Sequence, residues 1–138
     1  MIKVLLADDF EIIRVLMRYV LIKQGGIEVL AMVSNGQEAI DETIRHCPNV
    51  AVLDISMPIM DGLEAARQIS EKCTETRVLM VSMHHTPHHL RRSIEAGASG
   101  YVLKDDISHD LVSAVHTLHQ GKRFFSRQMA DLAQAYIE

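Results

Sequence analysis

The chain has 138 residues, of which 48% are hydrophobic and 23% are charged, and its formal net charge at pH 7 is −4. These values fit one domain with a full core and argue against non-specific binding of nucleic acid, which an acidic surface repels. No apolar run approaches the ~20 residues that cross a bilayer, no signal peptide precedes the first predicted strand, and the two cysteines lack metal-ligand spacing, so we expect a cytoplasmic protein with free thiols at Cys47 and Cys73.

Short apolar runs alternate with helical patterns along the first part of the chain. The run from Ile2 to Ala7 predicts a strand, and the apolar residues then recur at a helical period until Gly25-Gly26 end the helix. A second strand is expected over residues 28–33. The next helix begins at Asn35, which has Glu38 at the spacing of a capping box. The residues expected to face the core from these two helices are Ile12, Ile13, Leu16, Met17, Val20, Leu21, Ala39, Ile40, Thr43 and Ile44.

The central stretch, Val50 to Asp54, is apolar up to its last residue. This predicts a strand covered on both faces, as in a parallel sheet. Met57-Pro58 and Asp61-Gly62 then turn the chain, and Asp61 is expected to cap the next helix. The buried stripe expected for that helix is Leu63, Ala66 and Ile69. Asp54 thus stands at the carboxyl end of a buried strand, where open α/β sheets place their chemistry.

The same alternation continues through the remaining residues. Strands are predicted over residues 77–82 and 100–104, a helix runs from Thr86-Pro87 to near Gly97, and another begins at Ser108. Ser126 can cap a last helix. The residues expected to face inward from the last two helices are Leu111, Val112, Val115, Leu118, Met129, Leu132, Ala133 and Tyr136. Five strand–helix alternations predict an α/β fold with a doubly wound parallel sheet.

Polar side chains end four of the five predicted strands: Asp8-Asp9, Asp54, Ser82 and Lys104. If the first and third strands are neighbours, three carboxylates converge and repel one another. Bound Mg²⁺ would offset this repulsion, since it prefers a few carboxylates together with water and phosphate oxygens. A lysine and a hydroxyl at the same place can hold the oxygens of a phosphoryl group. Asp54 is therefore a candidate carboxylate nucleophile for phosphoryl transfer.

This constellation resembles the bacterial response-regulator receiver domain, and the resemblance covers essentially the whole chain. The family pattern is an acidic pair after strand one, an Asp and a turn after strand three, Ser or Thr after strand four and Lys after strand five. The resemblance implies a flavodoxin-like, five-stranded sheet of order 2-1-3-4-5, with Asp54 phosphorylated by a sensor histidine kinase. It also implies Mg²⁺ held by Asp9, Asp54 and the backbone carbonyl of Ser56, and by Asp8 through water.

The resemblance also implies roles for the later strand ends. Ser82 and Lys104 would contact the phosphoryl oxygens, and Tyr101 stands where the family has its switch aromatic. On phosphorylation Ser82 would move toward the phosphate and the ring of Tyr101 would turn inward. A half-buried strand residue without a switch role is the alternative for Tyr101. Such a protein is a switch rather than an enzyme, because it assists only its own phosphorylation and dephosphorylation.

Residues 96–105 and 121–126 resemble receivers fused to LuxR-type (NarL/FixJ) helix-turn-helix DNA-binding domains, in which the lysine is typically followed by an acidic residue, here Asp105. We therefore expect a receiver domain over residues 1–124. Residues 125–138 would be a C-terminal helix that starts the linker to a DNA-binding domain absent from this chain. An excised domain is favoured over a stand-alone receiver. The expected outputs are a homodimer on phosphorylation and DNA binding through the absent domain only, with no membrane partner.

Three other functions compete with this interpretation. An Mg²⁺-dependent phosphohydrolase with an aspartyl nucleophile usually needs an acid–base aspartate two residues later, where this chain has Ser56. A flavin-binding electron carrier needs a phosphate loop after the first strand, where Asp8-Asp9 would repel the phosphate. A degenerate receiver that acts by protein–protein interaction alone is disfavoured by the complete set of key residues.

The histidines are not explained by the family resemblance. The segment His84-His85-Thr86-Pro87-His88-His89 holds four imidazoles beside the predicted phosphorylation site, and His116 with His119 forms a second pair. Their spacing is compatible with metal binding, and imidazole titrates near neutral pH. A polar loop and helix face without any ligand is the favoured interpretation. His84 is also a candidate for controlling the access of water to an acyl phosphate.

Overall fold

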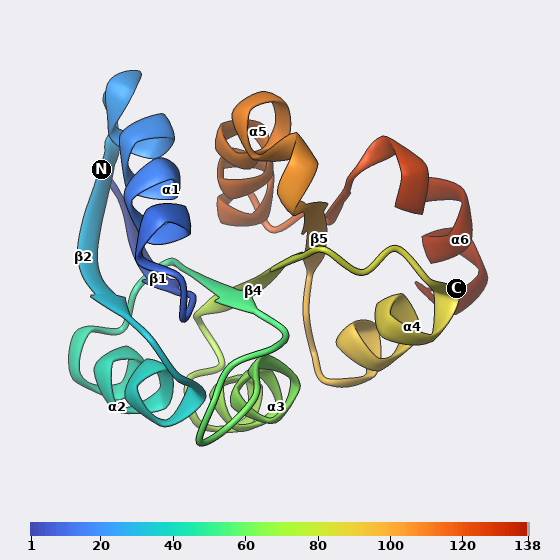
Figure 1. The fold of residues 1–138 in the computed structure, drawn as a ribbon, viewed down its shortest axis with the longest axis horizontal. Helices are drawn as coiled ribbons and strands as arrows, with labels where there is room; N and C mark the ends of the chain where they lie inside the picture. The colour runs from blue at the N-terminus through green and yellow to red at the C-terminus, as the bar shows by residue number, and fades with distance from the viewer. Residues whose placement is uncertain (138) are drawn as a thin grey trace.

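A computed structural model describes residues 1–137 and shows one parallel sheet of order β2-β1-β3-β4-β5-β6 between layers of helices (Figure 1). The flavodoxin-like fold is confirmed, with a sixth strand of two residues at the edge. The strands are β1 (Ile2–Ala7), β2 (Ile27–Val33), β3 (Val50–Asp54), β4 (Arg77–Ser82), β5 (Gly100–Leu103) and β6 (Phe124–Phe125). The helices are α1 (Glu11–Lys23), α2 (Gly36–His46), α3 (Gly62–Lys72), α4 (Pro87–Glu95), α5 (Ile107–His119) and α6 (Arg127–Ile137), with a 3₁₀ turn, η1 (Lys104–Asp106). Glu138, the last residue of the predicted C-terminal segment, lies outside the described residues.

The side chains of each strand alternate between two cores. On β1, Val4 and Leu6 face the core covered by α1 and α5, whereas Leu5 and Ala7 face the core covered by α2, α3, α4 and α6. Figure 1 shows α1 and α5 on one side of the sheet and α2, α3 and α4 on the other. Because β1, β3, β4 and β5 are buried on both faces, their carboxyl ends are held rigidly at one edge, which is where the polar residues follow.

Three of the predicted caps form as expected. Asn35 Oδ1 accepts the backbone N–H of Glu38 at 2.9 Å, and Asp61 Oδ1 accepts that of Glu64 at 2.9 Å. Thr86 caps α4, with Pro87 at its first position. These side chains satisfy N–H groups that a helix leaves without a partner, and they fix where α2, α3 and α4 begin beside the ends of the strands.

Four residues expected to face the core are exposed instead: Ile12 (77%), Leu16 (37%), Ile44 (51%) and Tyr136 (38%). The predicted faces were too wide, because a helix lying on a sheet buries only a narrow stripe; on α1 that stripe is Met17 and Leu21. Strand β5 also ends one residue earlier than predicted, so that Lys104 begins the η1 turn. Within residues 1–137 no helix is long and apolar enough to cross a membrane.

Candidate functional site

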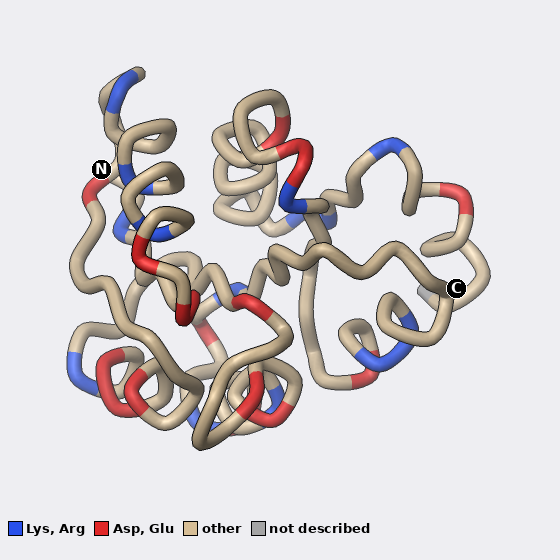
Figure 2. Tube along the Cα trace, viewed as in Figure 1, with Lys and Arg blue, Asp and Glu red and all other residues tan. Residues whose placement is uncertain are grey.

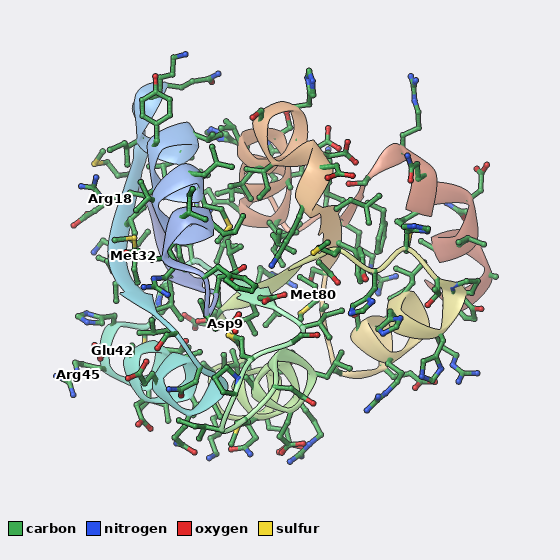
Figure 3. The ribbon with its side chains drawn as sticks, viewed as in Figure 1. Asp9, Arg18, Met32, Glu42, Arg45 and Met80 are labelled. Carbon is green, nitrogen blue, oxygen red and sulfur yellow. The ribbon has the colours of Figure 1, made fainter. Side chains whose placement is uncertain are left out.

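Three carboxylates meet where β1 and β3 end. Strands β1 and β3 are hydrogen-bonded neighbours with Ala7 aligned to Leu53, so the residues that follow lie side by side. One oxygen from each of Asp8, Asp9 and Asp54 lies within 4.8 Å of the others. Asp8 and Asp54 are buried and Asp9 is exposed; in Figure 3 Asp9 is labelled at this edge of the sheet. The convergence predicted from the strand ends is confirmed.

Lys104 reaches this cluster from the other side. Its Nζ lies 3.0 Å from Asp8 Oδ2 and 3.4 Å from Asp54 Oδ2. The first contact is an ion pair without hydrogen-bond geometry, and among the described residues Asp8 Oδ2 accepts no hydrogen bond although it is buried. Asp8 Oδ1 accepts the backbone N–H of Phe10 at 2.9 Å. One ammonium therefore faces three carboxylates, which leaves net negative charge at the site.

This excess of negative charge changes the acidity of Asp54. Burial, and then the charge of Asp8, raise the pKa of Asp54 from 3.8 to about 6, against the opposing effects of Lys104 and of the backbone N–H of Ser56. The Ser56 N–H lies 3.4 Å from Asp54 Oδ1. A divalent cation would favour the ionised form. The residues fit such an ion, because they offer hard oxygen ligands from two buried carboxylates and one exposed one, with a buried oxygen that still lacks a donor.

The loop after β3 is folded tightly against Asp54. The backbone N–H of Gly62 donates to the carbonyl of Ile55 at 2.8 Å, and a Cβ on Gly62 would lie 1.9 Å from the Asp54 carbonyl oxygen. Ile59 has a φ of 69°. The residues on either side of it are joined by a hydrogen bond from the Met60 N–H to the Pro58 carbonyl at 2.7 Å. A β-branched residue in this conformation is strained. Close packing at Gly62 and the strained turn together fix the direction of the chain leaving Asp54.

Ser82 and Tyr101 come from β4 and β5. Val81 is aligned with Asp54 across the β3–β4 pair, so Ser82 follows one residue beyond Asp54. Ser82 is buried, and its Oγ accepts the backbone N–H of His84 at 3.0 Å. The ring of Tyr101 is fully buried, and its hydroxyl donates to the carbonyl of His84 at 2.6 Å. The ring is therefore already turned inward, rather than half-buried.

These groups share one open cavity of about 490 Å³. Its lining residues are Asp9, Phe10, Asp54, Ser56, Ser82, Met83, His84 and Lys104. An open cavity lined by two carboxylates, an ammonium and a hydroxyl can admit a cation together with a tetrahedral anion.

Sequence reasoning missed two residues that support the acidic cluster. Arg14, in the first turns of α1, donates from Nη1 to the carbonyl of Asp8 at 2.6 Å. The ring of Phe10 lies 5.6 Å from Lys104 Nζ, within reach of a cation–π contact. In the sequence, Arg14 looks like an ordinary polar residue of a helix and Phe10 like an ordinary apolar residue. Nothing in the spacing signals these contacts.

The histidines form no three-ligand metal site. Within residues 1–137 the cluster of three or more potential ligands is the one formed by Asp8, Asp9 and Asp54. The rings of His84 and His89 are instead stacked, with centroids 3.9 Å apart and planes 2° from parallel. Cys47 and Cys73 are both free thiols, as expected.

Comparisons with known proteins agree with this geometry. The model of the response regulator receiver domain family matches residues 4–116. Oxygen regulatory protein NreC of Staphylococcus epidermidis is 34% identical over 128 residues, which are 92% of this chain and 59% of NreC. Response regulator UvrY of Escherichia coli is 32% identical over 139 aligned positions, which span 100% of this chain and 64% of UvrY. The chain thus spans about three fifths of the length of these relatives.

Among solved structures, a two-component response regulator of the LuxR family from Aurantimonas sp. SI85-9A1 superposes with a TM-score of 0.91. The two sequences are 31% identical, and the match covers 99% of this chain and 98% of that one.

Proposed function

The chain belongs to the response regulator receiver domain family, as a receiver of the LuxR/NarL type, and we propose that its Asp54 accepts a phosphoryl group from the phosphohistidine of a sensor histidine kinase. The observation that carries this proposal is that the Asp54 carboxylate lies close to the carboxylates of Asp8 and Asp9 and in contact with the Lys104 ammonium. The cavity beside it is open to a donor.

Mg²⁺ is the cation that we propose for the acidic cluster. Asp9 and Asp54 would bind it directly, the backbone carbonyl of Ser56 would supply a third oxygen, and Asp8 would act through water. When bound, it neutralises charge on the carboxylates and on the incoming phosphoryl oxygens. The raised pKa of Asp54 supports this assignment, because a site that disfavours three ionised carboxylates favours a counter-ion.

The chemical step is the formation of an acyl phosphate. An oxygen of the ionised Asp54 attacks phosphorus, the phosphorus–nitrogen bond of the phosphohistidine breaks, and its electron pair returns to the imidazole. Lys104 Nζ, now shared between Asp8 and Asp54, would contact a phosphoryl oxygen. The hydroxyl of Ser82, which accepts a bond from His84 and also hydrogen-bonds Tyr101, would turn its proton to another phosphoryl oxygen.

Tyr101 and Ser82 would carry the signal away from the site. The Tyr101 ring already lies inside, bonded to the His84 carbonyl in the β4–α4 loop. Phosphorylation would stabilise this arrangement through Ser82 and so fix the surface formed by α4, β5 and α5. The protein would act as a switch and not as an enzyme with an external substrate.

We propose that this switch controls dimerisation and transcription in the cytoplasm. The curated relatives are longer than this chain, and residues 125–138 would begin a linker to a DNA-binding domain. Residues 1–124 would be the receiver itself. Helix α6 contacts α4, so its position depends on the surface that the switch changes.

Intact mass spectrometry after incubation with Mg²⁺ and acetyl phosphate tests this function. We expect a gain of one phosphoryl group in the wild-type chain, and no gain in Asp54→Asn or in the presence of a chelator. Continuous release of phosphate from p-nitrophenyl phosphate without a stable adduct would favour the phosphohydrolase instead. If the chain is not modified and does not hydrolyse the substrate, the result would indicate a degenerate receiver.

A further inference from the structure

The β4–α4 loop holds an aromatic stack that the phosphorylation chemistry does not use. His84 lies in this loop and His89 in the first turn of α4, and their rings are parallel with centroids 3.9 Å apart. His88 meets His89 edge to face at 5.7 Å. Parallel imidazoles direct their nitrogen lone pairs into separate planes, so this pair does not chelate a metal ion as it stands.

The backbone of His84 carries both contacts of the proposed switch. Its N–H donates to Ser82 Oγ at 3.0 Å, and its carbonyl accepts the Tyr101 hydroxyl at 2.6 Å. Movement of His84 would therefore change the position of Ser82 and Tyr101 together.

His89 is held on its other side by the cap of α4. Thr86 Oγ1 accepts the backbone N–H of His89 and lies 2.7 Å from His89 Nδ1. Because the threonine oxygen already accepts a bond, its own proton is free to donate to Nδ1. When the hydroxyl donates in this way, His89 is neutral with its proton on Nε2, because a protonated Nδ1 has no lone pair to accept a bond.

We propose that His89 is a positioning residue whose neutral ring, stacked on His84, holds Ser82 and Tyr101 in place, and that protonation of the stacked pair releases this clamp. The effect of this clamp on signalling rests on the proposed function, whereas the clamp itself is present without phosphorylation. It would make the response to phosphorylation weaker in acid than at neutral pH.

The surroundings of the stack disfavour a positive charge. Two imidazolium rings 3.9 Å apart repel each other, and the N-terminus of a helix repels cations. Helix α4 has no acidic residue in its first turn and carries basic ones further along (Figure 2). The pKa of His89 is lowered from 6.5, first by burial and then by His84, His88 and Arg92. The stacked state therefore loses stability as pH falls below 6.5, because the released state binds protons more readily.

Within residues 1–137 no acid forms an ion pair with His84 or His89, although Asp105 and Asp106 line a cavity with His85 of the same loop. The cavity beside His84 holds Lys104 and Asp54, which pair with each other, and β5 contributes the neutral Tyr101. On α3, Glu64 pairs with Arg67. The charged residues nearest the start of α6 are Arg127 and Asp131, both exposed, and on α4 itself Glu95 lies near Arg91 at 4.0 Å.

Nuclear magnetic resonance of the unphosphorylated protein between pH 7.5 and 5.5 tests the clamp. Because Asp54, which shares a cavity with Ser82 and His84, has a pKa of about 6, every protein in this comparison carries Asp54→Asn. With the histidines unchanged we expect the amide signals of Ser82 and His84 and the ring signals of Tyr101 to shift together, with one midpoint below pH 6.5. His89→Phe keeps a flat ring but cannot titrate, so these shifts should be lost. His84→Phe tests the other ring of the stack in the same way and should give the same loss. His88→Phe removes the edge contact and one neighbouring imidazole that lowers the pKa of His89, so it should keep the joint shift with its midpoint moved upward.

Two results in the Asp54→Asn background would overturn the proposal: signals of Ser82, His84 and Tyr101 that stay fixed over this range when the histidines are unchanged, or equal shifts in His89→Phe and His84→Phe. A functional arm compares initial rates of modification by acetyl phosphate at pH 7.5 and 5.5. Because protonation of Asp54 at pH 5.5 lowers the rate in every variant, we expect a larger fall in the wild type than in His89→Phe. If no variant is modified at either pH, the proposed function fails while the resonance result still decides the clamp.

Discussion

Lys104 Nζ lies 3.4 Å from Asp54 Oδ2, although Asp54 ends β3 and Lys104 follows β5, and β4 separates these two strands. The same ammonium is 3.0 Å from Asp8 Oδ2, so a single cation bridges the ends of β1 and β3. This bridge offsets only part of the negative charge of the cluster.

Removal of the Lys104 charge should raise the pKa of Asp54 further above 6. Lys104 lowers this pKa through its charge and its hydrogen bond, whereas burial and Asp8 raise it. The measurement is a carbon-13 titration of the Asp54 carboxyl group in Lys104→Met without divalent ions. Lys72→Met, which changes an exposed lysine at the end of α3, is the control. An unchanged midpoint in Lys104→Met would show that the contact has no electrostatic effect.

Asp54→Asn should stabilise the metal-free protein at neutral pH. Asp54 binds its proton more tightly in the folded state, with a pKa of about 6 against 3.8 unfolded, so the native state loses stability as pH rises from 3.8 through 6. The full effect corresponds to about 3 kcal/mol, and we expect a gain of about 1–3 kcal/mol in the free energy of unfolding at pH 7.5. Urea unfolding with a chelator measures it.

The gain from Asp54→Asn should shrink as pH falls toward 5, because Asp54 of the folded wild type is then mostly protonated and, like asparagine, neutral. Asp131→Asn, an exposed carboxylate on α6, should show neither effect. A loss of stability in Asp54→Asn at pH 7.5 would mean that the ionised carboxylate is well satisfied in the folded protein.

Mg²⁺ should stabilise the wild-type chain against unfolding. A ligand that binds only the folded state adds about 2.7 kcal/mol at a concentration a hundred times its dissociation constant. Asp9→Asn removes one of the three clustered carboxylates and should require several-fold more Mg²⁺ for the same rise in melting temperature. Asp131→Asn again serves as the matched control. Equal Mg²⁺ dependence in wild type and Asp9→Asn would place the cation elsewhere.

Ser126→Ala should loosen the junction between β5 and α6. Ser126 Oγ accepts the backbone N–H of Leu103 at 3.0 Å and donates to Asp110 Oδ2 at 3.3 Å. Loss of the hydroxyl leaves a buried N–H without this partner, which costs about 1–3 kcal/mol. Urea unfolding gives the loss, and faster amide exchange at Leu103 locates it. Ser113→Ala on the exposed side of α5 should leave both unchanged, and equal exchange at Leu103 in all three proteins would refute the coupling.

Local pattern was sufficient to predict the doubly wound sheet and the polar strand ends, whereas the order of the strands, on which the acidic cluster depends, came from the family resemblance. Apolar runs defined the buried strands, and parallel strands bring their carboxyl ends to one edge, so Asp9 and Asp54 could be placed together without coordinates. The width of a buried helix face could not be predicted, since the packing of each helix on the sheet decides which apolar residues are covered, and Ile12 and Ile44 are not.

Contacts between side chains that are distant in the sequence were also beyond prediction. The stack of His84 on His89 depends on the path of the β4–α4 loop, and the two bonds of Ser126 depend on where α6 begins. The two-residue strand β6, Phe124–Phe125, forms by pairing with the edge of β5, and two apolar residues are too few to predict a strand.

The most direct test of the proposed function is to locate the phosphoryl group. Borohydride reduces an aspartyl phosphate to homoserine, which peptide mass spectrometry identifies by position. After incubation with Mg²⁺ and acetyl phosphate, we expect homoserine at position 54 of the wild-type chain and at no other aspartate, and none in Lys104→Met incubated under the same conditions for a short time. Homoserine at another position, or its absence from position 54 in a chain that has gained a phosphoryl group, would contradict the assignment of Asp54 as the phosphoacceptor.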